Sequence, residues 1–264
     1  MKGRCVICSA LGKLTADHVP PKALVPATAV EVQQLIAATG GRHDDLPRPR
    51  GAFQAPRFPS LCAECNNQRL GARADVALIA MAAQLARWVN AARMHGILLP
   101  DRAELDVDAQ GVARAVIGHL LAAEERSTPS APLANGTALF AMRAFFLERA
   151  TEPPPFRLFV WPFLGTDITI VRGFSLARVL GDAHGPVIGD VLKFFPLAFW
   201  LVHHAPDDVV FPFAQIPLQS EGICRLRIPL RRLPPQWPEM PGPKEVVALT
   251  AERTYLARQS APAR

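Results

Sequence analysis

The chain has 264 residues, of which half are hydrophobic and a fifth are charged, and its formal net charge is +6. This composition excludes an intrinsically disordered protein, because such chains contain too few apolar residues to form a core. The length suits one or two domains. The mild positive charge is compatible with nucleic acid as a partner but is also common in proteins that bind none.

The N-terminal sequence MKGRCVICSALGK lacks the apolar segment of a secretory signal, so we expect a cytoplasmic protein with reduced thiols. The most apolar stretch, residues 191–202, contains Lys193 and Pro196 and is shorter than the roughly 20 residues of a membrane helix. The sequence therefore predicts a buried strand pair or core segment there and no membrane association.

Four of the five cysteines form two pairs with the same short spacing. Two residues separate Cys5 from Cys8, and two separate Cys62 from Cys65. Two such pairs, or knuckles, can supply four thiolates to a tetrahedral zinc ion. Four thiolates leave no open coordination position, so we predict one structural zinc per chain. Cys224 has no remaining partner and is expected to be a small core residue.

An acid and a histidine stand side by side between the knuckles, at Asp17 and His18, and two prolines follow closely. Neighbouring residues on a strand point to opposite faces, so one can hold a metal while the other addresses the substrate. After the second knuckle, Asn66 begins a polar helical turn. Its amide can supply a neutral oxygen to a hard cation beside a carboxylate, although such an asparagine can also be an ordinary helix cap.

In this order the motifs CVIC, DHVPPK and CAECNN resemble the HNH endonucleases, whose ββα-metal fold is braced by two C-x-x-C knuckles. The resemblance covers about residues 4–73. It implies that Asp17 and Asn66 ligate one Mg²⁺ or Mn²⁺ ion and that His18 is the general base. It also implies that Cys5, Cys8, Cys62 and Cys65 hold the zinc, with Lys22 and Arg69 near the scissile phosphate.

The chain departs from the family pattern between the strands. The family usually has an asparagine or histidine there that orients the general base, and the only histidine between residues 19 and 61 is His43. Either His43 takes this function, or a backbone carbonyl orients the base, or activity is weakened.

The segment between the strands also carries a proline-spaced basic arm with only two acidic residues against it. The arm consists of Arg42, Arg48, Arg50 and Arg57, and the acids are Asp44 and Asp45. Such an arm could contact DNA phosphates independently of sequence, or it could be a solvated loop. Residues 1–75 hold ten basic against six acidic side chains, whereas the rest of the chain holds nineteen against seventeen. The basic excess is therefore concentrated in the part that contains the cysteine pairs.

The remaining residues predict helices near 72–94, 109–125 and 136–149, and strands after residue 155, among them 156–161, 167–174 and 224–230. His203 and His204 follow the apolar run and are predicted to be exposed imidazoles at a strand end, in preference to a second metal site.

Together these patterns predict an α+β protein with a zinc-braced module over residues 1–75 and an α+β region of unknown function over residues 76–264. The leading functional hypothesis is a metal-dependent DNA endonuclease in a bacterial defence or mobile-element setting, where similar proteins are found. The alternative is a non-catalytic zinc-knuckle protein that binds nucleic acid or a protein partner.

Overall fold

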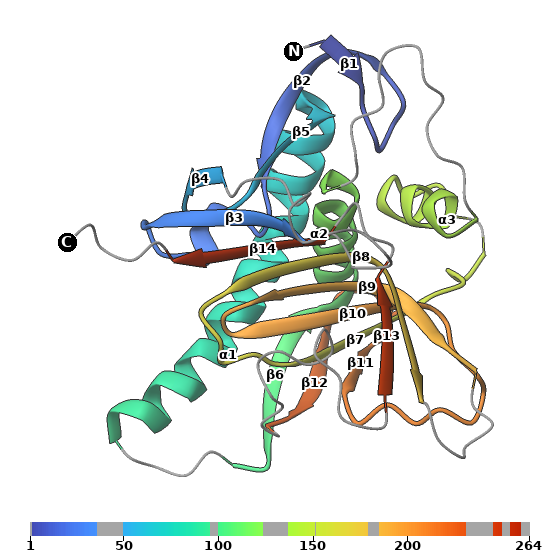
Figure 1. Ribbon diagram of the computed structural model, residues 1–264. Helices are drawn as coiled ribbons and strands as arrows, with labels where there is room; N and C mark the ends of the chain where they lie inside the picture. Colours follow the sequence, from blue (N-terminus) through green and yellow to red (C-terminus); the bar gives the residue numbers. More distant parts are fainter. Residues whose placement is uncertain are drawn as a thin grey trace.

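The computed structural model has an α+β fold, as the sequence predicts (Figure 1). The residues that it describes are 2–35, 50–95, 100–123, 137–150, 152–178, 185–230, 245–249 and 254–259.

The first structural unit is a small antiparallel sheet that leads into a long helix. It contains β1 (Lys2–Arg4), β2 (Leu11–His18) and β5 (Arg57–Cys62), in the order β1-β2-β5. After β5 the chain enters a π-type helical segment, η3 (Glu64–Ala74), which continues directly into α1 (Asp75–His95). A short 3-10 turn, η1 (Lys22–Leu24), follows the two prolines after β2. This order of two paired strands and a helix positions the residues singled out above.

The segment between the two cysteine pairs connects this unit to the rest of the molecule. Its strands β3 (Ala29–Leu35) and β4 (Arg50–Phe53) pair with each other, and β3 pairs with β14 (Thr254–Gln259) near the C-terminus. Residues from both predicted regions therefore share one sheet.

That large sheet contains nine strands within the described residues. Its main path is β11-β7-β10-β9-β8-β14-β3-β4, and β13 (Glu245–Leu249) also pairs with β8. The strands not yet bounded are β7 (Arg157–Pro162), β8 (Ile168–Arg178), β9 (Val187–Phe194), β10 (Leu197–His204) and β11 (Ala214–Ile216). The apolar run at 191–202 forms much of the β9–β10 hairpin and is buried, in agreement with the predicted strand pair.

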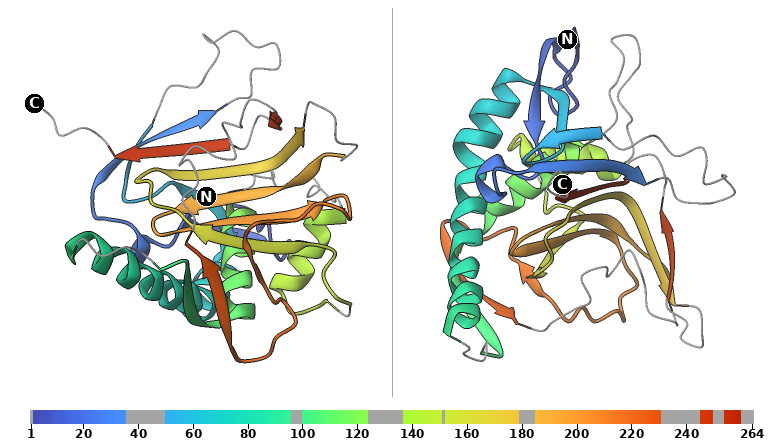
Figure 2. Two further views of the ribbon diagram at one scale, coloured as in Figure 1. Left: turned by 90° about the horizontal axis from the view of Figure 1, so that it is seen from below. Right: turned by 60° about the vertical axis from the view of Figure 1, so that its left-hand side comes forward.

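The helix α2 (Ala109–Ala122) lies in the centre of the fold, between α1 and α3 (Thr137–Phe146) (Figures 1 and 2). Twelve of its fourteen residues are buried. A Cβ atom added at Gly118 would lie 2.6 Å from Phe146 and 2.7 Å from Leu70, so this glycine permits close approach of α3 and η3 to α2. The strands β6 (Arg102–Asp108) and β12 (Ile223–Pro229) form a separate antiparallel pair.

The three helices occupy the places where the sequence predicts helices, although the helical conformation before α1 already begins at Glu64. Among the described residues, no helix combines the length and apolarity that crossing a bilayer requires.

Candidate functional site

The two cysteine pairs come together in space. The ligand atoms of Cys5, Cys8, Cys62 and Cys65 all lie within 4.8 Å of one another, which is compatible with a single metal ion. The backbone N–H of Cys65 points to the Sγ atom of Cys62 at 3.5 Å, so the second pair forms a tight turn around its thiols. The turn of the first pair is closed by a hydrogen bond from Cys5 N to the carbonyl of Ala10.

The thiols of this cluster influence one another's ionisation. Hydrogen bonds from Cys65 and Cys8 lower the pKa of the Cys5 thiol, while hydrogen bonding to Cys5 raises the pKa of the Cys65 thiol. Four neighbouring thiolates repel one another, so all four can ionise together only around a cation. A set of four soft sulfur ligands this close together fits zinc.

A buried arginine from α3 contacts the first cysteine pair. Arg143 donates a hydrogen bond from Nε to the carbonyl of Val6 at 2.7 Å. Burial and the charge of Arg172 lower the pKa of Arg143, and the Cys5 thiolate opposes this shift. A Zn²⁺ ion with four thiolates carries a formal charge of −2, so this guanidinium would compensate part of the charge of such a site, a contact that the sequence patterns did not reveal.

Asp17 and His18 lie at the end of β2, where the pairing with β5 is irregular. A register shift interrupts the β2–β5 ladder between Thr15 and Asp17. The Asp17 side chain is buried and the His18 side chain is half-buried. The two neighbours therefore occupy different environments, as their alternation on a strand predicts.

Asp17 is one member of a buried carboxylate–histidine–carboxylate cluster. Nδ1 of His119, on α2, lies 2.9 Å from Asp17 Oδ2, and Nε2 lies 2.9 Å from Asp75 Oδ1 on α1. Ionised carboxylates only accept hydrogen bonds, so both ring nitrogens donate and the imidazole is protonated. Burial opposes this charge, but Asp17 and Asp75 outweigh it and raise the pKa of His119 to about 10. The cluster carries a net charge of −1.

Burial and nearby charges of both signs act on the ionisation of His18. Burial and the charge of Arg57 lower the pKa of His18, Asp17 acts in the opposite direction, and Lys22 lowers the pKa further. Arg57 pairs with His18 across the β2–β5 ladder, and both Arg57 and Lys22 are exposed. His18 is thus a neutral imidazole near pH 7, with two cations in its electrostatic environment.

Asn66 packs against the strand that carries Asp17. Its Nδ2 donates to Thr15 Oγ1 at 2.9 Å, and the Thr15 hydroxyl donates to the carbonyl of Leu61 at 3.0 Å. Within the described part of the chain, neither Asn66 Oδ1 nor Asp17 Oδ1 has a hydrogen-bond partner. These two hard oxygens are the atoms that suit Mg²⁺ or Mn²⁺.

The other predicted phosphate-binding residues differ in their surroundings. Arg69 is ion-paired with Glu64 at 2.8 Å, so its charge is already compensated. Arg50 is exposed on β4. Arg42, His43 and Arg48 lie outside the described residues.

A second buried cluster contains His203, on β10. Asp190 on β9 accepts a hydrogen bond from His203 Nε2 at 2.8 Å and pairs with Arg172 Nε at 3.1 Å. Burial opposes the charge of Asp190, but Arg172 and His203 hold its pKa below the usual range. The prediction of exposed imidazoles is therefore wrong for His203, because Asp190 binds it within the sheet, and correct for His204.

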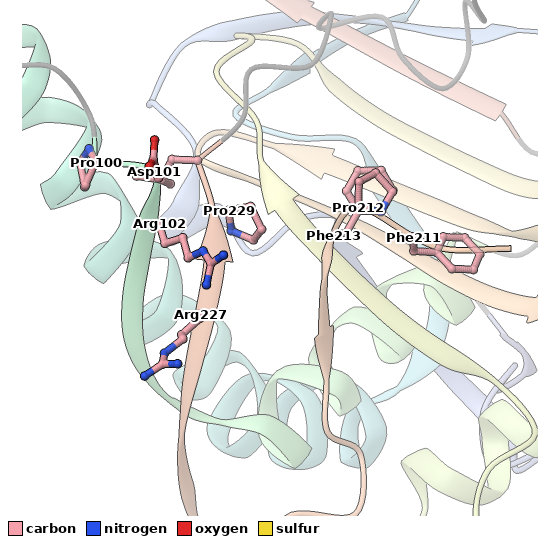
Figure 3. Close-up of a pocket in the computed structure, with 9 residues that line it drawn as sticks. Pro100, Asp101, Arg102, Phe211, Pro212, Phe213, Arg227 and Pro229 are labelled. Atoms are coloured by element: carbon pink, nitrogen blue, oxygen red, sulfur yellow. The ribbon is translucent and has the colours of Figure 1, made fainter.

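The structure also contains a pocket of about 750 Å³, lined by residues between Pro100 and Leu230. Arg102 and Arg227 lie on one side of it, on the β6–β12 pair, and Phe211 and Phe213 lie on the other (Figure 3). Arg227 is ion-paired with Glu104 at 2.9 Å. None of the candidate site residues that the structure describes lines this pocket.

Comparisons with protein-family models, with characterised proteins and with solved structures give no match to this chain.

Proposed function

We propose that the chain is a metal-dependent endonuclease that hydrolyses phosphodiester bonds of DNA, with its reaction centre at Asp17 and His18. The observation that carries this proposal is the contrast between these neighbours. Asp17 belongs to a buried cluster of net negative charge with one oxygen unengaged, whereas His18 has a lowered pKa beside Arg57 and Lys22. In this proposal Asp17 would hold the cation, His18 would act as the base, and Arg57 and Lys22 would attract the phosphate.

In this proposal His18 accepts a proton from water, and the resulting hydroxide attacks phosphorus. A new phosphorus–oxygen bond forms, the bond to the leaving oxygen breaks, and that oxygen is protonated by water. A histidine suits the first task because its neutral form is available near pH 7. The lowered pKa of His18 increases the fraction in that form.

Asp17 and Asn66 would hold the divalent cation through their unengaged oxygens. One carboxylate and one amide oxygen are hard ligands, and the net charge of −1 on the Asp17 cluster attracts a cation. When bound, such a cation supplies Lewis-acid stabilisation of the developing negative charge. Arg57 and Lys22 would bind the phosphates on either side of the scissile bond.

The alternative, a zinc-knuckle protein that binds nucleic acid or a partner without catalysis, has one observation in its favour. Asp17 is only 7 % exposed and is engaged with His119, so it contributes to the core independently of any metal. Under this alternative, Arg57 and Lys22 would still bind phosphate, but no bond would be cleaved.

The test is incubation of purified protein with supercoiled plasmid and Mg²⁺ or Mn²⁺, with and without EDTA. His18→Ala should reduce cleavage by about 10²–10⁴-fold, as loss of a general base does. His204→Ala is the matched control, because that imidazole is exposed at the end of β10 and is not among the candidate site residues. Equal cleavage by the parent protein and both variants would contradict the proposal.

Asp17→Asn distinguishes the metal ligand from the base. Asparagine keeps an oxygen that can accept from His119 but removes the negative charge, so cleavage should fall and recover partly at high Mn²⁺ concentration. Cleavage by His18→Ala should not recover in this way. Salt-sensitive DNA binding without EDTA-sensitive cleavage in the parent protein would favour the alternative.

A further inference from the structure

The candidate site receives a residue from the second predicted region. His119, on α2, lies 102 residues from Asp17 along the chain. Its imidazole nevertheless lies between the carboxylates of Asp17 and Asp75. We propose that His119, held by Asp75, is a positioning residue that fixes the Asp17 carboxylate with its Oδ1 atom directed toward the divalent cation. This inference rests on the proposed function.

The geometry fixes the imidazole ring at both ends. Its two nitrogens each lie 2.9 Å from a carboxylate oxygen, so rotation of the ring would break two charge-assisted hydrogen bonds. Asp75 lies within continuous helix, at the point where η3 passes into α1, so its backbone is fixed as well. The Asp17 carboxylate in turn has its Oδ2 atom engaged, which leaves Oδ1 as the oxygen available to a ligand.

The surroundings of His119 hold it in place. Its side chain is fully buried, and the next turn of α2 is tied to β5 by a 2.6 Å hydrogen bond from Ser60 Oγ to the carbonyl of Ala122. On the other side, the neighbouring Gly118 leaves no room for even one additional carbon against Leu70 and Phe146. The core therefore holds the imidazole in one position, and the imidazole in turn holds the Asp17 carboxylate through its hydrogen bond.

The charge of the cluster also indicates a function beyond packing. Burial of ionised groups is costly unless they are fully compensated, and here two carboxylates share one imidazolium. A cation at Asp17 Oδ1 would supply the missing positive charge. Carboxylates that bind metals are commonly held by outer hydrogen bonds of this kind, and loss of such a partner typically costs about 10–100-fold in metal affinity.

Two substitutions at His119 separate its two hydrogen bonds. In His119→Asn, the amide nitrogen can take the place of Nδ1 and still donate to Asp17, while the bond to Asp75 is lost. In His119→Gln, the amide nitrogen can take the place of Nε2 and donate to Asp75, while the bond to Asp17 is lost. The two variants remove the same ring and the same charge, so they are matched controls for each other.

The experiment measures uptake of Mn²⁺ in the presence of a cleavage-resistant phosphorothioate duplex, by the loss of the free-ion EPR signal beyond the loss that the duplex alone causes. His119→Gln should weaken Mn²⁺ binding about 10–100-fold, and His119→Asn should weaken it much less. Asp75→Asn, which keeps His119 in place, is a third variant should either substitution prevent folding. Zinc content and thermal melting report on the fold of each protein.

Equal Mn²⁺ affinity in His119→Asn and His119→Gln, whether reduced or at the wild-type level, would overturn the positioning role. A parent protein that binds Mn²⁺ and cleaves DNA, with a His119→Gln variant that does both equally well, would overturn this inference while the proposed function stands. A parent protein that takes up no Mn²⁺ and cleaves no DNA would overturn both.

Discussion

Two buried clusters next to α2 each join a histidine to aspartate, and they differ in which residue occupies the centre. In the first, His119 lies between Asp17 and Asp75. In the second, Asp190 lies between Arg172 and His203 and also accepts a hydrogen bond from the backbone N–H of Gly173. Arg172 further donates to the carbonyl of Leu120, next to His119, so both clusters adjoin the same turn of α2.

The order of charges decides what each cluster can do. The Asp190 cluster is compensated from within, since both of its carboxylate oxygens are engaged with donors. The His119 cluster retains a net negative charge and an unengaged oxygen on Asp17. The same residue types thus form a structural brace in the sheet and a candidate cation site beside β2. The predictions below test this difference, beginning with the largest expected effect.

The largest effect should come from removal of a cysteine ligand. Cys62→Ser should abolish binding of the single zinc ion and unfold the β1-β2-β5 sheet, because structural zinc contributes roughly 10–16 kcal/mol in comparable small sites. The Asp190 cluster lies outside that sheet, so hydrogen exchange in β9 and β10 should remain slow. Elemental analysis and hydrogen-exchange mass spectrometry provide the measurements.

Cys224→Ser is the matched control for this experiment, because Cys224 lies on β12 and is not among the four clustered thiols. It should retain one zinc per chain. Freshly purified, unchelated parent protein without zinc would contradict the assignment of the cysteine cluster.

Replacement of Asp190 or Asp17 by asparagine, one at a time, should separate effects on stability from effects on metal binding. Asp190→Asn leaves the buried Arg172 charge without its carboxylate, which typically costs about 3–5 kcal/mol of unfolding free energy. Asp17→Asn leaves His119 paired with Asp75, so its cost should be nearer about 1–3 kcal/mol. Urea denaturation should rank the variants in this order. Mn²⁺ binding should show the opposite ranking, with Asp17→Asn impaired and Asp190→Asn, where folded, unaffected.

Local patterns in the sequence predicted much of this arrangement. The spacing of the cysteines predicted their cluster, and the apolar run at 191–202 predicted the β9–β10 hairpin. The pairing of β3 with β14 could not be predicted, because it joins segments more than 200 residues apart and no local pattern specifies such a partner. The assignments of Asp17, His18 and Asn66 as catalytic residues remain predictions.

His119 was also missed by sequence reasoning, although one signal was present. It is the single ionisable residue in the stretch AVIGHLLAA, where the apolar pattern predicts a buried helix face. A lone polar residue in such a stretch requires a buried partner, but the sequence gives no indication of which acid provides it. Only the packing of α2 against both α1 and β2 identifies Asp75 and Asp17.

Alkaline pH should weaken the His119 cluster selectively. The folded-state pKa of His119 is raised from 6.5 to about 10, so its contribution to stability is complete below pH 6.5 and is lost as the pH rises through about 10. Asp190 behaves in the opposite sense, because its lowered pKa contributes stability above its usual value that is lost in acid. The difference in unfolding free energy between the parent and His119→Gln should therefore shrink from neutral pH to pH 10. A constant difference across this range would show that His119 is neutral in the folded protein.

The smallest effect concerns the neighbouring base. Burial and, after it, the charge of Arg57 lower the pKa of His18. In a plot of cleavage rate against pH, the acid limb, where protonation of His18 stops cleavage, should therefore lie below the ordinary histidine pKa of 6.5. Replacement of Arg57 by methionine removes the second of these causes, so the limb should move to higher pH, and less so at high salt, which screens exposed charges. Arg50→Met is the matched control, since Arg50 is exposed on β4 and is not among the charges that shift His18. Plasmid cleavage measured between pH 5 and pH 8 at two salt concentrations gives the comparison. Equal displacement of the limb in both variants would assign it to general charge, whereas displacement in Arg57→Met alone would identify His18 as the titrating base.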